Sequence, residues 1–99
     1  MIFYLLLALL AMVPQVTVTG GFNVSSSVRL TWNASAGAAT YNVLRGAIGG
    51  PYTPIASGVA VTTYTDSAVP PHAQACYVVQ AVNSKGTSGN SNEACAQMP

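Results

Sequence analysis

Hydrophobic and polar positions divide the chain into two unlike parts. Residues 1–13 read MIFYLLLALLAMV, an apolar run dominated by the strong helix formers Leu, Ala and Met. Pro14 lacks the backbone N–H that a helix interior needs, so the predicted helix ends there. The pattern therefore predicts a hydrophobic helix over residues 1–14 and a separate domain over residues 15–99.

The second part alternates apolar and polar residues in short runs. Residues 27–33 read SVRLTWN, which places Val28, Leu30 and Trp32 on one face of a half-buried strand. Clusters of glycine and proline, such as residues 49–51, separate the runs. Strands are predicted at residues 15–19, 27–33, 40–45, 52–56, 62–65, 75–83 and 90–97, with a turn at Gly58. Short strands at intervals of about ten residues favour an all-β sandwich of seven strands.

Three interpretations of the apolar run stay open. Its length fits a secretory signal peptide, whose cleavage would remove residues 1–20, but no Lys or Arg precedes it and no Ala-x-Ala site follows. As a retained anchor it would rise about 20 Å against a hydrocarbon core of about 30 Å, so it would need an extension or surrounding membrane subunits. In the third interpretation the helix buries itself inside an assembly. We favour retention, with attachment through the apolar side chains Ile2, Phe3, Leu5, Leu6, Leu9, Leu10 and Val13.

Charged residues are unusually scarce. Lys and Arg number 3 and Asp and Glu number 2, or 5% of the chain, against about a quarter in ordinary proteins. Because no cluster of Lys and Arg is available to follow a phosphate backbone, the composition excludes a nucleic-acid partner. A surface of Ser, Thr, Asn and Gln is typical of an extracytoplasmic module or a packed assembly subunit.

The same scarcity argues against catalysis. A serine nucleophile needs a positioned base and a group that orients the base, yet the chain has a single His and no Gly-x-Ser-x-Gly motif. His72 follows two prolines and is expected to be a solvated loop residue, whereas Asp66 is expected to bond the backbone of its own turn. We therefore predict no catalytic residue, no metal site and no cofactor.

Several stretches resemble a known family. The stretch VRLTWNASAGAATYNVLRG resembles strands B and C of a fibronectin type III domain, and TTYTD resembles strand E. The stretch GGPYTPIASGV resembles a connection in bacterial members, and CYVVQAVNSKGTSGNSNEACAQMP resembles strands F and G. The resemblance covers about residues 16–99 and implies a two-sheet sandwich that serves as a spacer, adhesion or recognition module, usually without catalysis.

This resemblance also implies which residues fill the core. Trp32 corresponds to the core tryptophan of the family and Tyr41 to its inward aromatic residue on strand C. The residues expected in the core are Leu30, Trp32, Tyr41, Val43, Tyr77 and Val79. Ala75 departs from the pattern, because the family usually has a tyrosine there. We therefore expect the hydrogen bond of the tyrosine corner to be absent and the core to be thin at that end.

The two cysteines lie in the segments that resemble strands F and G. If these strands form a hairpin that turns at Lys85-Gly86, Cys76 lies opposite Cys95. The same register pairs Val78 with Glu93 and Gln80 with Ser91. We predict a Cys76–Cys95 disulfide on the outer face of the sheet, formed in an oxidising compartment.

Tyr52, Tyr64 and Phe22 are the candidates for an exposed platform on which a sugar could stack. The simpler interpretation is that they are partly buried sandwich residues. Protein subunits are accordingly the partners we expect first, and a glycan comes second.

Two functional hypotheses follow. In the first, the protein is a non-catalytic structural or accessory subunit, held by its N-terminal helix to protein subunits of a membrane complex, filament or virion. It would then be extracytoplasmic, in the periplasm or at the cell surface, and membrane-associated through residues 1–13. In the second, residues 1–20 are cleaved and the remainder is a secreted module that binds carbohydrate or protein.

Overall fold

A computed structural model describes residues 16–19 and 27–98 of the chain. The predicted helix at residues 1–14 and its proposed anchor residues lie outside this part, as does Phe22. The described residues form an all-β sandwich without a helix. None of them belongs to a helical segment long and apolar enough to cross a lipid bilayer.

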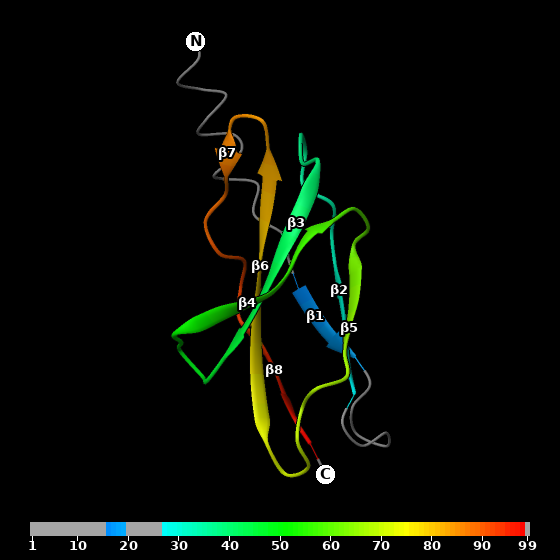
Figure 1. The fold of residues 1–99 in the computed structure, drawn as a ribbon, viewed down its shortest axis with the longest axis vertical. Helices are drawn as coiled ribbons and strands as arrows, with labels where there is room; N and C mark the ends of the chain where they lie inside the picture. Colours follow the sequence, from blue (N-terminus) through cyan, green and yellow to red (C-terminus); the bar gives the residue numbers. More distant parts are fainter. Residues whose placement is uncertain (1–15, 20–26, 99) are drawn as a thin grey trace.

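Two antiparallel sheets make up the sandwich (Figure 1). The first sheet has the order β1-β2-β5 and consists of β1 (Val16–Thr19), β2 (Val28–Trp32) and β5 (Thr63–Asp66). The second has the order β4-β3-β6-β7, with β8 also paired to β6. It consists of β4 (Tyr52–Val59), β3 (Thr40–Gly46), β6 (Gln74–Asn83), β7 (Gly86–Thr87) and β8 (Ala94–Gln97).

Six of the predicted strands correspond to β1 to β6, with ends that differ by a few residues. The turn predicted at Gly58 is wrong, because this residue lies inside β4 in the left-handed region, with φ of 66°. The strand continues past it to Val59, because glycine tolerates this backbone conformation without a steric penalty.

The last predicted strand, residues 90–97, is wrong in its first half. β8 begins at Ala94, and a separate short strand, β7, follows the hairpin turn. Asn83 pairs with Gly86, so the turn lies at Ser84-Lys85 and not at Lys85-Gly86. The final strand of the sandwich is thus divided into two pieces, with residues 88–93 between them.

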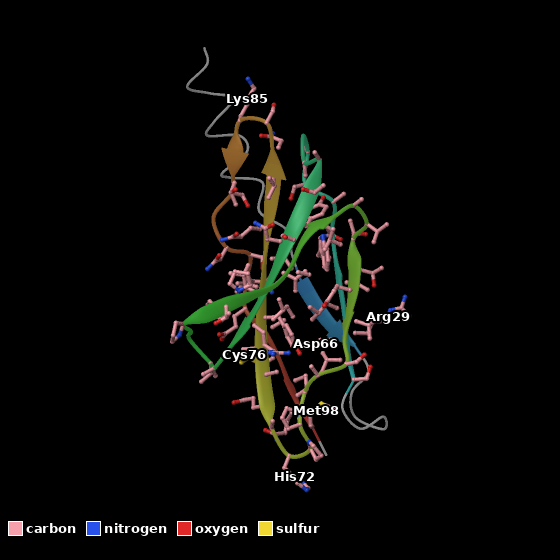
Figure 2. All side chains as sticks on the ribbon, viewed as in Figure 1. Arg29, Asp66, His72, Cys76, Lys85 and Met98 are labelled. Carbon is pink, nitrogen blue, oxygen red and sulfur yellow. A yellow bond between two sulfur atoms is a disulfide. The ribbon has the colours of Figure 1, made fainter. Side chains whose placement is uncertain are left out.

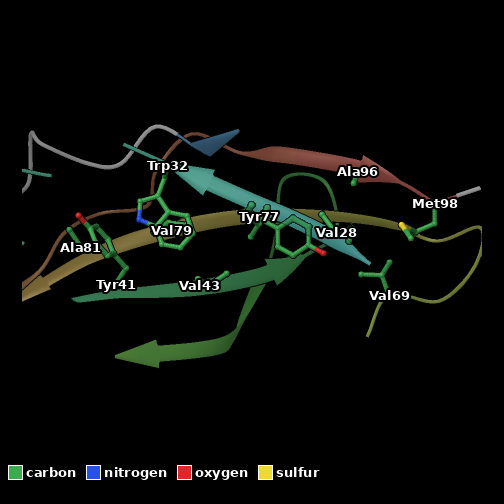
Figure 3. Close-up of a cluster of buried hydrophobic side chains, with 12 residues drawn as sticks. Val28, Trp32, Tyr41, Val43, Val69, Tyr77, Val79, Ala81, Ala96 and Met98 are labelled. Carbon is green, nitrogen blue, oxygen red and sulfur yellow. The ribbon is translucent and has the colours of Figure 1, made fainter. Parts of the chain in front are cut away.

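The core lies between the two sheets and is built from residues at alternate strand positions. The six residues expected there, Leu30, Trp32, Tyr41, Val43, Tyr77 and Val79, are all buried. The ring of Trp32 meets that of Tyr41 edge to face, with centroids 5.5 Å apart and planes at 66°. Figure 3 shows these rings on opposite sheets, so the pair joins the two layers.

The end of the core beside Ala75 is filled by other residues. Ala75 pairs with Ala96, and both are buried. Val69 and Met98, each 2% exposed, belong to the same cluster and lie at this end in Figure 3. Side chains from the β5–β6 connection and from the residue after β8 therefore pack against the core at this end.

Candidate functional site

A buried carboxylate links the two sheets. Asp66, at the end of β5, is 4% exposed. Its Oδ2 accepts hydrogen bonds from Arg45 Nη1 at 2.6 Å and from Tyr77 Oη at 2.7 Å. Its Oδ1 accepts one from the Ala68 backbone N–H at 3.1 Å, which is the turn bond expected from the sequence. Arg45 lies on β3 and Tyr77 on β6, so Asp66 bridges the first sheet to the second.

The hydrogen bonds of Asp66 shift the ionisation of all three groups. Burial alone would raise the pKa of the Asp66 carboxyl, but the bonds from Arg45, Tyr77 and Ala68 outweigh it and lower that pKa. The pKa of Tyr77 is raised, by burial and by its bond to the carboxylate. The pKa of Arg45 is raised because its guanidinium bonds to Asp66. The carboxylate is therefore ionised at neutral pH and committed to structural bonds, not poised as an acid or base.

A hollow of about 390 Å³ lies beside this network. It is lined mainly by small apolar residues from the end of β3, the β5–β6 connection and the start of β6: Gly46, Ala47, Ala68, Val69, Pro70, Ala73 and Ala75, together with Arg45 and Gln74. Arg45 is the charged side chain of the lining, and it is a third exposed. The lining holds no second titratable group, so the hollow offers binding space but no acid–base pair.

The disulfide lies on the second sheet. Cys76 and Cys95 are opposite one another on β6 and β8 and are bonded, as predicted. Cys76 alternates away from the core but has no exposed surface, whereas Cys95 on the edge strand is accessible. The bridge therefore sits on the outer face, with one of its two cysteines covered.

Glu93 and Tyr52 meet next to the bridge. The Glu93 carboxylate accepts a hydrogen bond from the Tyr52 hydroxyl and one from the Gly49 backbone N–H, the latter at 2.7 Å. The bond from Tyr52 raises the pKa of the tyrosine hydroxyl. A carboxylate oxygen of Glu93 and the two disulfide sulfurs all lie within 4.8 Å of one another. Because the sulfurs are bonded to each other, they are not available as metal ligands in this state.

A row of side-chain amides crosses the outer face of the second sheet. Asn42 Nδ2 donates to Gln80 Oε1 at 3.2 Å, and Gln80 Nε2 donates to Asn90 Oδ1 at 2.8 Å. The row joins β3, β6 and the segment between β7 and β8. Asn42 keeps an unused carbonyl oxygen and Asn90 an unused amide group in this chain of bonds, so the row can still bond a polar, uncharged ligand.

The two tyrosines proposed for sugar stacking are not brought together. Tyr52 lies on β4 and bonds Glu93 on the outside of the second sheet. Tyr64 lies on β5 in the first sheet and packs against the core. They therefore cannot form one platform. His72 is exposed and sits at the end of the molecule opposite Lys85 (Figure 2).

Three features were not foreseen from the sequence. The pairing of Asp66 with Arg45 and Tyr77 needs three strands that are remote in sequence, so no local pattern announces it. Glu93 was expected opposite Val78, but the ladder of β6 and β8 ends at Tyr77–Ala94, which leaves Glu93 to reach Tyr52 and Gly49. Likewise Ser91 bonds Val79 rather than pairing with Gln80.

Known proteins share both the sequence and the fold, although no protein-family model matches the chain. A solved Fn3-like protein from Clostridium thermocellum is 40% identical, with a TM-score of 0.77, and the match covers 88% of this chain and 92% of that one. A β-1,2-glucanase from Parabacteroides distasonis contains a similar fold at 22% identity and a TM-score of 0.74, over 12% of its chain.

One relative is a much larger enzyme. An amylopullulanase from Thermoanaerobacterium thermosulfurigenes is 40% identical to this chain over 84 residues, or 83% of the chain. This chain spans only 4% of the length of that protein.

Proposed function

The chain belongs to the fibronectin type III family, and on this premise we propose that it is a non-catalytic accessory module of an extracytoplasmic assembly. Domains of this fold occur within larger proteins, among them the amylopullulanase, the glucanase and titin. In such a role the sandwich supplies a compact, disulfide-braced body that spaces or docks other parts.

One observation carries the proposal: the reactive groups of the described residues do not converge. The Asp66 carboxylate is committed to Arg45 and Tyr77, and the Glu93 carboxylate to Tyr52 and Gly49. Since an acid–base or nucleophilic site needs such groups within reach of one substrate atom, this arrangement favours a scaffold over a catalyst.

The compartment follows from the disulfide. Disulfides persist in oxidising environments and are rare in the cytosol. The Cys76–Cys95 bridge therefore supports an extracellular or periplasmic location. The low charge of the chain suits a surface that neighbouring subunits cover, because burying a charge at an interface is costly.

For attachment, we propose that residues 1–13 hold the module to protein subunits of a membrane complex, filament or virion. The support is the apolar run itself. Intact-mass spectrometry of the protein from its native source tests this. A mass matching residues 1–99 that cofractionates with a larger assembly is expected. A species that begins near Gly21 and runs as a free monomer would overturn the attachment and favour a secreted module.

A second function, binding of a neutral glycan, is favoured by the amide row and by Tyr52, which both lie on the outside of the second sheet. Side-chain amides and an aromatic ring suit an uncharged, hydroxyl-rich ligand. Affinity electrophoresis through gels that contain starch or pullulan tests it. Retarded migration that is lost in Tyr52→Ala and Gln80→Ala is expected, with Thr65→Ala on the other sheet as the matched control. Migration that no polysaccharide retards would exclude this function.

A further inference from the structure

The two sulfurs of the disulfide differ in access. Cys76 is held between β3 and β8 on the central strand β6 and has no exposed surface. Cys95 lies on the edge strand β8, where its position is exposed. A thiolate that attacks a disulfide needs access to one sulfur and expels the other as a thiolate, so access helps to decide which sulfur is attacked. Of the two cysteines, Cys95 is the one whose residue has exposed surface.

A negative charge lies beside the point of attack. The Glu93 carboxylate is within 4.8 Å of both sulfurs. It is fixed there by Gly49 N–H at 2.7 Å and by the Tyr52 hydroxyl, which belong to the connection between β3 and β4 and to the start of β4. Both donors are neutral, so they hold the carboxylate in place without cancelling its charge.

The charge of Glu93 and the unequal exposure of the two cysteines both affect thiol–disulfide exchange at this bridge. We propose that Cys95 is the site of thiol–disulfide exchange in this protein, and that Glu93 makes the exchange selective for cationic and neutral thiols over anionic ones. Glu93 acts through the electrostatic field of its carboxylate and forms no bond with the reagent, so it is not a catalytic residue. The attacking species is a thiolate, which Glu93 repels, and a second negative group on the reagent increases the repulsion.

Atoms and electrons balance over two exchange steps. The reagent thiolate forms a bond to Cys95 Sγ, and the bond between Cys95 Sγ and Cys76 Sγ breaks. The electron pair passes to Cys76 Sγ, which takes a proton from water and becomes a buried thiol. A second reagent thiolate then attacks the reagent sulfur of the mixed disulfide and expels Cys95 as a thiolate, which takes a proton from water. The reagent is oxidised to its disulfide and the protein gains the two thiols.

The leaving group strengthens the effect. Cys76 must depart as a thiolate at a buried position next to a carboxylate, and both burial and like charge disfavour a thiolate. Glu93 thus slows the first step for every thiol and slows it most for an anionic one. A bridge with one covered sulfur and this neighbour therefore resists exchange with anionic thiols.

Mapping the mixed disulfide tests the assignment of the site. The full-length protein is treated with a small thiol, quenched in acid within the first turnover and mapped by peptide mass spectrometry. The adduct is expected on Cys95, with Cys76 as the free thiol. Adducts on Cys76, or equal adducts on both cysteines, would overturn the assignment.

Exchange rates with a charge series test the selectivity. Cysteamine is the cationic probe, 2-mercaptoethanol the neutral one and mercaptosuccinate the anionic one, with rates compared at equal thiolate concentration and low salt. Glu93→Gln is expected to speed exchange with mercaptosuccinate by roughly three- to tenfold more than exchange with cysteamine, the range for unit charges about 6 Å apart at the protein surface. High salt should reduce the difference.

Two control variants distinguish the local charge of Glu93 from two other effects. One effect is steric shielding of the disulfide, and the other is the net charge of the protein. Tyr52→Phe keeps the carboxylate and its bond from the Gly49 N–H, so the ratio of rates among the three probes should stay close to that of the unaltered protein. Lys85→Gln changes the net charge at the remote turn after β6 and should leave the ratio of rates unchanged. If Glu93→Gln accelerates exchange with all three thiols equally, Glu93 only shields the disulfide sterically and the proposed charge selectivity is wrong.

Discussion

At the residue scale, the Asp66 carboxylate links the two sheets by hydrogen bonds. Its carboxylate is the only acidic group among the described residues that is buried, and it accepts bonds from Arg45, Tyr77 and Ala68. Arg45 is a third exposed, so solvent weakens this ion pair relative to a fully buried one. The hydrogen bonds from Tyr77 and Ala68 add to the contribution of this ion pair.

We predict that Asp66→Asn lowers the free energy of unfolding by about 1–3 kcal/mol at pH 7, the range for a hydrogen bond to a charged group whose partners lose it. The pKa of Asp66 is lowered in the folded protein, so between the folded and unfolded values the unfolded chain binds more protons. The stabilisation is complete above the unfolded value of about 4 and is lost as the pH falls through the folded value. Urea unfolding of both proteins between pH 2 and 7 should show curves that converge in acid. A constant gap between them would contradict the assignment.

Gly46 is the position where backbone packing leaves no room for a side chain. A Cβ there would lie 2.1 Å from the carbonyl oxygen of Pro51, a backbone atom that cannot rotate away. Gly46→Ala is therefore expected to cost about 3 kcal/mol of stability, near the upper end for overpacking. Gly89→Ala is the matched control, because a Cβ at Gly89 meets nothing within 4 Å. Thermal unfolding of both variants checks this, and equal melting temperatures would refute it.

At the scale of elements, the interrupted last strand is held by two serines. Ser88 and Ser91 are buried, and each backbone N–H bonds a carbonyl of β6, at 2.8 Å to Ala81 and 2.9 Å to Val79. In return each serine Oγ accepts the N–H of the same β6 residue, at 2.8 Å in both cases. The hydroxyls thus take the place of the strand carbonyls that residues 88–93 do not present to β6.

We predict that Ser88→Ala and Ser91→Ala each cost about 1–3 kcal/mol, because each leaves a buried backbone N–H of β6 without an acceptor. Ser57→Ala, at an exposed position on β4, should change stability by less than about 0.5 kcal/mol. Urea unfolding measures the three variants. Faster amide hydrogen exchange at Ala81 in Ser88→Ala and at Val79 in Ser91→Ala would locate the effect. Unchanged protection at these amides would show that water replaces the hydroxyls without loss.

The sequence predicted most elements because alternation with a period of two is a local signal. The five residues of β2 are enough to predict the strand and its buried face, which consists of Val28, Leu30 and Trp32. The signal fails at residues 88–93, where serine hydroxyls replace backbone carbonyls as the acceptors for β6 and the apolar alternation is absent. It also fails at Gly58, since a glycine that reads as a turn is tolerated within the irregular pairing of β4 and β3.

At the scale of the molecule, a small core is supplemented by one covalent link. A chain of this length buries a smaller fraction of its surface than a larger domain, so a disulfide contributes a sizeable part of the net stability. The bridge joins positions separated by 19 residues on the central strand and on an edge strand. It therefore ties the C-terminal strand to the body of the sheet.

We predict that the double variant Cys76→Ala with Cys95→Ala loses about 3 kcal/mol of unfolding free energy, the value expected in the chain-entropy account for a loop of this size. Alanine is chosen because a serine hydroxyl would be buried at position 76. Urea unfolding of the double variant and of the oxidised protein gives the difference. If the two agree within error, the hairpin is fully specified by its hydrogen bonds and the bridge has no stabilising role.

The sequence by itself determined the fold class, the alternating strands, the buried faces and the cysteine pair, because each follows from local periodicity or from motifs that survive in order along the chain. Tertiary structure alone decided the partners of Asp66 and Glu93 and the unequal exposure of Cys76 and Cys95. It also decided that two serine hydroxyls, and not strand carbonyls, accept the β6 N–H groups beside the interrupted last strand. These depend on contacts between strands that are remote in sequence, where displacement of a few residues changes which polar groups meet. A local pattern carries no information about such contacts, so the hydrogen-bond partners of these groups are fixed only when the strands pair and the two sheets pack together.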